Sequence, residues 1–89
     1  MGRYRVLIKP SARKELLAIP TKKDRQRLVR KIKLLGADPR PAGCQKLTGG
    51  GDRYRVRQGQ YRIVYEIRDA ELVVLVVKPG HRLDVYRAL

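Results

Sequence analysis

Residues 53–67, RYRVRQGQYRIVYEI, decide the fold that this sequence can adopt. Apolar and polar residues alternate on both sides of Gly59-Gln60, which is the period of two half-buried β-strands joined by a tight turn. A register that pairs Val56 with Ile63 and Tyr54 with Tyr65 places the apolar residues of both strands on one face. It leaves a two-residue loop with Gly first, as a type II′ turn prefers. The stretch therefore predicts a β-hairpin with one buried face.

The other face of this hairpin collects arginine. The same register places Arg57 opposite Arg62, with Arg55 beside them opposite Val64. We expect all three guanidinium groups to project into solvent on the side of the sheet away from the helices, so that truncation of Arg62 leaves the fold intact. Like charges across a strand pair destabilise a sheet by a few tenths to about 1 kcal/mol per pair. This cost predicts a ligand that compensates the charges.

Two interpretations of the arginine cluster stay open, a solvated surface and an anion-binding site. Strands often place arginine outward, but a crowded surface normally mixes both signs of charge. Here Asp52 is the only acidic residue between Arg40 and Tyr65. Guanidinium groups bind phosphate oxygens in pairs and keep their charge at any accessible pH. The pattern favours phosphate, with the neighbouring tyrosines stacking on an unpaired RNA base.

The composition of the whole chain points the same way. Its 89 residues suit a single domain, residues 1–89. The 22 lysines and arginines outnumber the 8 acidic residues, which gives a net charge of +14. Such an excess indicates a polyanionic partner, namely nucleic acid, an acidic protein or an anionic membrane. Because the sequence shows neither an apolar run of about 18 residues nor a secretory signal, we expect a cytoplasmic protein with no membrane partner.

Metal and disulfide chemistry have few candidate residues. Cys44 and His81 are the only cysteine and the only histidine, which argues against a disulfide and against a zinc site. Metal-dependent nucleases hold magnesium with clustered carboxylates, whereas the acidic residues of this chain are scattered singly. We therefore expect any chemistry to proceed without a metal or a cofactor.

The segments before the hairpin predict one strand and two helices. Residues 3–9 alternate like a half-buried strand. We expect Ser11 to cap a first helix that Pro20 closes, and Thr21 to cap a second helix that Gly36 ends. An apolar stripe at helical spacing follows Thr21, formed by Leu28, Val29, Ile32 and Leu35. The opposite face is basic, and we interpret it as solvated in preference to a binding surface; it carries Lys22, Lys23, Arg25, Arg27, Arg30, Lys31 and Lys33.

The segments around the hairpin complete the sheet. Prolines and glycines predict that residues 39–43 and 49–51 are loops. Residues 71–78, ELVVLVVK, form a continuous β-branched run that is typical of a strand buried on both faces, so we expect a central strand there. The sum is an α+β fold, a small antiparallel (mixed) sheet with two N-terminal helices packed on one face.

Taken in order, these pieces resemble a known family. Over nearly its whole length the chain resembles the RelE branch of the RelE/ParE toxins. The resemblance lies in a strand, two basic helices and the segments KLTGG, YRVRQGQYRIVYEI, LVVLVVKPGHR and DVYR. The resemblance implies a ribosome-dependent endoribonuclease that cuts messenger RNA in the ribosomal A site without metal, by attack of the ribose 2′-hydroxyl on the adjacent phosphate. It also implies an acidic antitoxin protein as partner, and a toxin–antitoxin hetero-oligomer that binds DNA through the antitoxin.

The resemblance also implies which residues form the site. The family's basic and tyrosine positions fall on Arg55, Arg57, Arg62, Arg82 and Tyr86. The first two are often lysines in the family's best-known members, and arginine hardly ever gives up its proton. Arginine at these two positions can still stabilise negative charge on the phosphate, but we expect another group to transfer the proton.

That proton-transfer group is either His81 or Tyr86. His81 titrates near neutrality, but the resemblance places its neighbour Arg82 in the site. We expect the surrounding arginines to lower the pKa of Tyr86 and so to make it the better proton acceptor. Two other functions stay open beside the nuclease: a DNA gyrase poison like the ParE branch, and a basic RNA-binding module without catalysis. The five-residue arginine and tyrosine set favours the nuclease.

Overall fold

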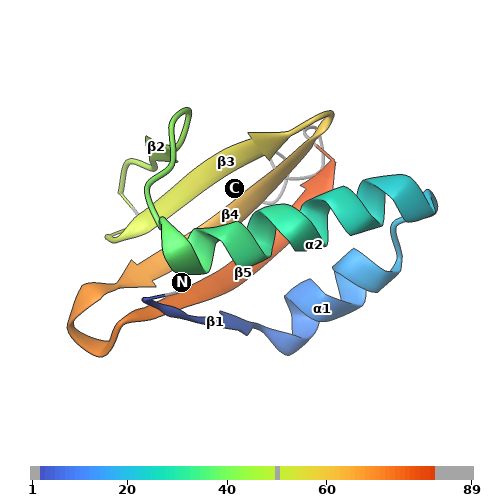
Figure 1. Ribbon diagram of the computed structural model, residues 1–89. Coiled ribbons are helices and arrows are strands. Elements are labelled where there is room, and N and C mark those ends of the chain that lie inside the picture. The colour runs from blue at the N-terminus through green and yellow to red at the C-terminus, as the bar shows by residue number, and fades with distance from the viewer. Residues whose placement is uncertain (1–2, 50, 82–89) are drawn as a thin grey trace.

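A computed structural model describes residues 3–49 and 51–81 of the chain. Within them the chain forms two α-helices, one 3-10 helix and a five-stranded sheet. In chain order these are β1 (Arg5–Ile8), α1 (Pro10–Leu17), α2 (Lys22–Ala37), β2 (Gln45–Lys46), β3 (Arg53–Gln58), β4 (Tyr61–Arg68), η1 (Asp69–Glu71) and β5 (Val73–His81). The sheet order is β1-β5-β4-β3-β2 (Figure 1), with β1 parallel to β5 and the other pairs antiparallel. The expected α+β fold with a mixed sheet is confirmed.

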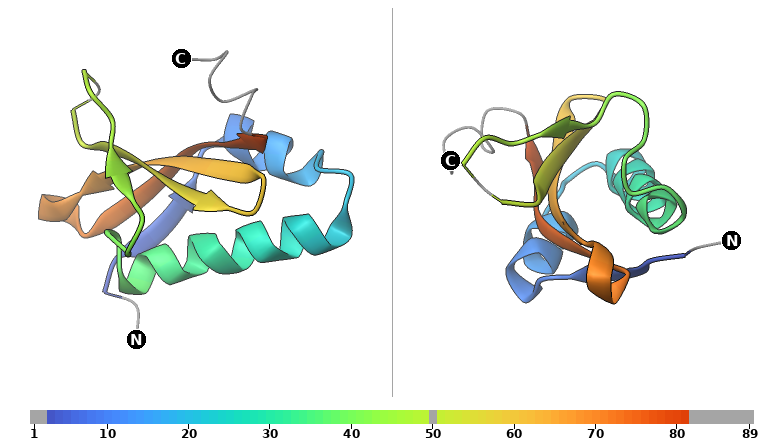
Figure 2. Two further views of the ribbon diagram at one scale, coloured as in Figure 1. Left: turned by 90° about the horizontal axis from the view of Figure 1, so that it is seen from above. Right: turned by 90° about the vertical axis from the view of Figure 1, so that its left-hand side faces the viewer.

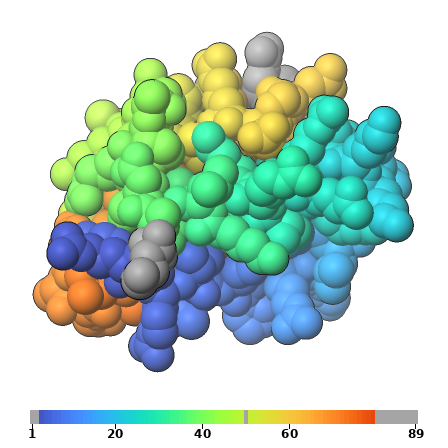
Figure 3. Space-filling model, in the orientation of Figure 1, coloured from blue at the N-terminus to red at the C-terminus, as the bar shows by residue number. Residues whose placement is uncertain are grey.

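The helices and one face of the sheet share a single apolar core. The helix α2 lies across that face (Figures 1 and 2), and α1 packs beside β5. In the space-filling view the side chains of α2 cover the middle of this side of the molecule (Figure 3). Neither helix, within the part of the chain that is described, is long and apolar enough to cross a membrane. The buried cluster consists of Ala12, Leu16, Ile19, Leu28, Ile32, Leu35, Val56, Ile63, Tyr65, Ile67, Val74 and Val76.

The hairpin has the register that the sequence predicts. Tyr54 pairs with Tyr65 and Val56 with Ile63, while Arg57 lies opposite Arg62. Gly59 has φ +62°, a left-handed conformation that a type II′ turn requires at its first central residue and that glycine adopts without strain. Period-2 patterning and one glycine were therefore sufficient to fix this part of the sheet.

The helix α1 begins earlier, and the helix α2 ends later, than the sequence predicts. The helix α1 begins at Pro10, not after Ser11, because proline suits a first helical position, where its missing N–H leaves no bond unmade. The helix α2 follows Thr21 as expected but continues through Gly36 to Ala37. A Cβ on Gly36 would lie 3.0 Å from Val6 Cγ2 and 3.1 Å from the carbonyl oxygen of Tyr4. Gly36 thus serves the close approach of α2 to the start of β1 and does not end the helix.

Two parts of the sheet were not expected. The two-residue strand β2 lies between the two segments predicted as loops, and it pairs with Tyr54 and Arg55 at the edge of β3. The last strand begins later than residue 71, because Glu71 belongs to η1 and Leu72 takes a left-handed conformation with φ 52°. The strand β5 is an interior strand, as expected, but the middle position of the sheet belongs to β4.

Candidate nucleic-acid interface

The sheet surface opposite the helices carries Arg55, Arg57 and Arg62, and we call it the arginine face. Residues paired across an antiparallel sheet share a face, so the register arranges this surface in two rows. One row runs from Gln45 through Arg55 and Val64 to Lys78, and the other from Arg57 through Arg62 to Gly80. Neighbouring strands lie about 4.8 Å apart. The three arginines therefore form a compact cluster on a rigid support.

Arg62 contradicts the expectation that all three arginines project into solvent. Its relative exposure is only 3%, and its Nε atom is fully enclosed. The physical reason is the sheet order, because β4 lies in the middle of the sheet, with Arg57 of β3 on one side of Arg62 and the backbone of Gly80 in β5 on the other. Arg62 is engaged in interactions within the chain. Its guanidinium group is thus a fixed part of the structure.

Arg55 and Arg57 differ in how they are held. Arg57 is exposed, as the sequence predicts. Arg55 is half-buried, and its Nη2 donates a hydrogen bond to Oε1 of Gln45 in β2. The short edge strand therefore orients Arg55, while Arg57 presents its charge to the solvent.

Acidic residues lie at one end of the sheet, away from the turn at residues 59–60. Glu66 accepts a hydrogen bond of 2.8 Å from Arg68 and lies 3.9 Å from Arg53. The hydrogen bond and charge of Glu66 raise the pKa of Arg68 above its usual range. Asp69 pairs with Arg40 at 2.9 Å. Positive charge is compensated at this end, so the excess on the arginine face concentrates near the turn.

The tyrosines of the hairpin do not stack beside the arginines. Tyr54 and Tyr61 pack against the core cluster, and Tyr65 is fully buried within it. The hydroxyl of Tyr65 donates a 2.7 Å hydrogen bond to the carbonyl of Pro39, and burial raises the pKa of Tyr65 above its usual range. The expectation that these tyrosines stack on an RNA base is therefore wrong, because the register turns them toward the helices.

Two of the expected site residues, Arg82 and Tyr86, lie outside the described residues. The backbone of His81 ends β5 in a pair with Tyr61. The structure therefore brings together Arg55, Arg57 and Arg62 on one surface. In the described ranges, no three His, Cys, Asp or Glu side chains gather as ligands for a metal ion.

Lys78 also lies on the arginine face, where sequence reasoning did not place it. It is paired with Val64, in the same row as Arg55. Its Nζ lies 2.9 Å from Oε1 of Glu15 in α1. The sequence did not indicate this position for Lys78, because the segment ELVVLVVK has the pattern of a strand that is buried on both faces.

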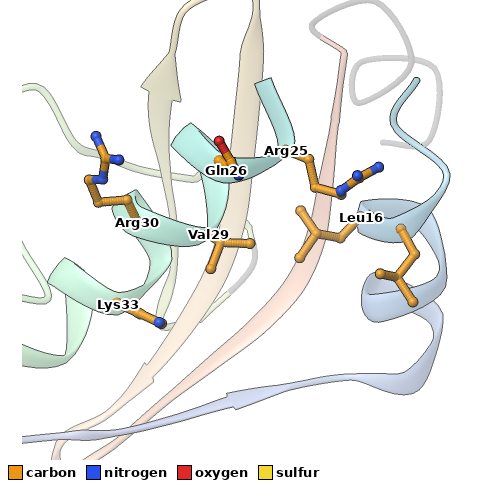
Figure 4. Close-up of a pocket in the computed structure, with 7 residues that line it drawn as sticks. Leu16, Arg25, Gln26, Val29, Arg30 and Lys33 are labelled. Carbon is orange, nitrogen blue, oxygen red and sulfur yellow. The ribbon is translucent and has the colours of Figure 1, made fainter. Parts of the chain in front are cut away.

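A second surface feature is a groove of about 530 Å³ between α1 and α2. Leu16 of α1 and Val29 of α2 point into the space between the two helices (Figure 4). Leu17 beside them is 64% exposed. The rim is basic, because Arg25, Arg30 and Lys33 also line the groove. The helix surface that we interpreted as merely solvated thus borders an apolar groove.

Comparison with known proteins gives one family match and several close structural matches. Residues 6–86 match the model of the ParE toxin of the type II toxin–antitoxin system parDE. The RelE–RelB complex of Pyrococcus horikoshii matches with a TM-score of 0.78 and 32% identity, over 90% of this chain and 96% of that chain. A mutant of E. coli toxin RelE in the free state matches with a TM-score of 0.77 and 28% identity over 100% of both chains.

The E. coli RelBE toxin–antitoxin complex is a further match. Its TM-score is 0.75 at 30% identity, and the match covers 88% of this chain and 95% of that chain. A search among curated protein sequences finds no match.

Proposed function

Because this chain belongs to the RelE/ParE family of toxins from type II toxin–antitoxin systems, we propose that it is a ribosome-dependent endoribonuclease that cuts messenger RNA in the ribosomal A site. The clustering of Arg55, Arg57 and Arg62 on one sheet face supports this proposal most strongly. A strand pair accepts like charges at a cost in stability. A phosphate group in contact with them offsets that cost.

In the proposed reaction the ribose 2′-oxygen attacks the adjacent phosphate and the bond to the 5′-oxygen breaks. Negative charge builds on the phosphate oxygens in the transition state, and preorganised positive groups stabilise such charge best. Arg62 suits this role because its burial fixes its guanidinium group before the substrate arrives. Arg57 and Arg55 contribute charge from the neighbouring strand, and Arg82 adds a further phosphate contact. Tyr86, in its phenolate form, accepts the proton of the 2′-hydroxyl group.

Mapping of cellular transcripts tests this function. After brief expression of the toxin, primer extension should reveal discrete cuts within translated codons. The Arg57→Ala variant, which changes an exposed side chain only, should leave the same messages intact. Intact messages after expression of the wild-type protein would overturn the proposed nuclease activity.

A DNA gyrase poison is the second candidate, because the matching family model is that of the ParE toxin. The same expression experiment distinguishes the two, since a gyrase poison leaves messages intact and causes DNA damage. Intact messages without DNA damage, together with RNA binding, would indicate a basic RNA-binding module without catalysis.

The partner that neutralises this toxin is, in our proposal, an acidic antitoxin with an amphipathic helix. The structural matches include toxin–antitoxin complexes. Apolar side chains of such a helix fit the groove beside Leu17, and acidic residues along its edges face Arg25, Arg30 and Lys33. We further propose that the pair acts in the cytoplasm and assembles into a hetero-oligomer that binds DNA through the antitoxin.

A further inference from the structure

A β-bulge in β5 reverses the alternation of its side chains. Val74 and Val76 pack into the core on the helix side of the sheet, and strict alternation would send Lys78 to the same side. The register shifts at this point, because Tyr65 pairs with Val76 whereas the preceding Val64 pairs with Lys78. Val77 is the extra residue. Bulges occur often beside active sites, where they redirect a side chain, and this bulge turns Lys78 onto the arginine face.

The bulge places Lys78 beside the arginine cluster. Lys78 and Arg55 lie on either side of Val64 in one row of the sheet, and Arg62 in the next row is the diagonal neighbour of Lys78. Diagonal neighbours on one face lie about 7 to 8 Å apart, within reach of long side chains. The next residue, Pro79, takes the buried position opposite Ile63.

Glu15 holds the ammonium group at the margin of this face. The strand β1 ends at Ile8, which pairs with Val76, and α1 packs beside β5. Lys78 Nζ lies 2.9 Å from Glu15 Oε1, and the side chains are 27% and 42% exposed. An ion pair exposed to this degree contributes little to stability. Because the Lys78 side chain is partly exposed and this pair is weak, the ammonium group can turn to a substrate on the arginine face.

We propose that Lys78 is the general acid of the cleavage reaction, a role that rests on the proposed nuclease function. Cleavage needs a proton for the leaving 5′-oxygen, and arginine does not supply one because its guanidinium group stays protonated at any accessible pH. Among the described residues of the arginine face, Lys78 is the cation whose proton can be transferred. The arginines stabilise the negative charge of the transition state, and Lys78 protonates the leaving 5′-oxygen.

The step balances without an external reactant. The 2′-oxygen forms a bond to phosphorus as the bond from phosphorus to the 5′-oxygen breaks, and the 2′-hydroxyl proton passes to the phenolate of Tyr86, the base that the proposed function assigns. Lys78 transfers its ammonium proton to the departing 5′-oxygen. The products are a 2′,3′-cyclic phosphate and a 5′-hydroxyl group, and Lys78 then regains a proton from water.

Single-turnover cleavage on programmed ribosomes tests this role with two messages. One carries the natural 5′-oxygen at the cleavage site, and the other carries a bridging 5′-sulfur, which departs without protonation. With the oxygen message, Lys78→Gln and Lys78→Arg should each cleave about 100-fold more slowly than wild type, because general acid catalysis typically contributes that much or more. With the sulfur message, both variants should cleave within a few-fold of the wild-type rate. Lys46→Gln, the same change on an exposed residue paired with the helix-facing Tyr54, is the matched control.

Three outcomes would overturn the assignment while leaving the nuclease in place. An equal loss on both messages would make Lys78 a positioning residue only, and a fully active Lys78→Arg variant would show that charge alone suffices. A fully active Lys78→Gln variant would exclude any role. Failure of the wild-type protein to cleave the oxygen message would instead remove the proposed function, and this inference with it.

Discussion

At the scale of single residues, the same side-chain type plays two physical roles in this protein. Arg57 is exposed, whereas Arg62, directly opposite, is 3% exposed. An exposed arginine contributes charge to a ligand and little to the fold. A buried arginine also contributes the packing of its long side chain, so its truncation disturbs the structure around it.

Truncation of these two arginines should therefore separate catalysis from stability. We expect Arg57→Ala to slow cleavage about 100-fold and to change the free energy of unfolding by less than about 0.5 kcal/mol. Arg62→Ala should slow cleavage and also reduce the free energy of unfolding by about 1 to 3 kcal/mol. Urea unfolding and single-turnover cleavage measure the two effects. Equal stability of the two variants would contradict the burial of Arg62.

Asp69 gives a second test at this scale, through the pH dependence of stability. Hydrogen bonds from Arg40 and Tyr4 lower the pKa of Asp69 below its usual range. A carboxyl group whose pKa is lower in the folded state stabilises the fold above its unfolded pKa, near 3.9. That stabilisation disappears as the pH falls through the folded pKa.

We expect Asp69→Asn to unfold at lower urea concentration than wild type at pH 7. The difference should shrink below about pH 4, as urea titrations at a series of pH values would show. Asp52→Asn removes the same charge from an exposed position and is the matched control. A stability difference for Asp69→Asn that stays constant down to pH 2 would exclude the linkage.

At the scale of elements, contacts between neighbouring segments decide where helices and strands begin and end. The backbone N–H groups of Arg3 and Tyr4 donate to the carbonyl of Gly36 at 3.1 Å and 2.9 Å, which ties the start of β1 to the last turn of α2. In the same way β2 exists only as a partner of β3, and its Gln45 orients Arg55.

The contact between α2 and β1 predicts an unusual response to a helix-favouring substitution. Glycine to alanine inside a helix normally stabilises by about 0.5 to 1 kcal/mol. At Gly36 the new Cβ would lie 3.0 Å from Val6 Cγ2 and 3.1 Å from the carbonyl oxygen of Tyr4, both closer than ordinary van der Waals contact. The Tyr4 carbonyl is restrained because the N–H of Arg5, in the same peptide group, donates to the carbonyl of Leu72 at 2.8 Å. We expect Gly36→Ala to reduce the free energy of unfolding by about 1 kcal/mol net.

A double-mutant cycle with Val6→Ala identifies the cause. If the clash with Val6 contributes, the Gly36→Ala penalty should be smaller in the Val6→Ala background. Thermal unfolding of the four proteins gives the coupling. A stabilising Gly36→Ala substitution would show that β1 yields to the added methyl group.

At the level of the whole molecule, two separate surfaces carry part of the basic residues behind the net charge of +14. The arginine face carries one part, and the outer side of α2 carries another beside the apolar groove. An acidic antitoxin that binds the groove therefore gains from both charge and apolar contact. Only the electrostatic part of this affinity is screened by salt.

Antitoxin binding should consequently show two separable components. We expect the affinity of the wild-type toxin to fall at least tenfold between about 0.1 M and 1 M salt, where the Debye length shrinks from about 10 to 3 Å. Leu17→Ser, which changes an exposed apolar residue of the groove, should weaken binding by a similar factor at every salt concentration. Titration calorimetry measures both. A salt-independent wild-type affinity would exclude electrostatic attraction, and an unaffected Leu17→Ser variant would exclude the groove.

Local sequence patterns were sufficient to predict both helices, the strands β1, β3, β4 and β5, and the hairpin register. Period-2 alternation, the glycine at residue 59 and the helical spacing of Leu28, Ile32 and Leu35 act over a few residues, so they can be read without knowledge of the fold. They also placed Arg55, Arg57 and Arg62 on a common face. The nuclease roles of Arg82 and Tyr86 stay predictions from family resemblance.

The way in which that face is built became visible only in the folded chain. Arg62 is buried because β4 lies in the middle of the sheet, and Lys78 joins the arginines because a bulge at Val77 reverses the alternation of β5. Position 36 requires glycine because the start of β1 approaches it closely. Each of these features depends on segments far apart in the chain, whose contacts leave no periodic signal in the sequence, and so local patterns could not determine them.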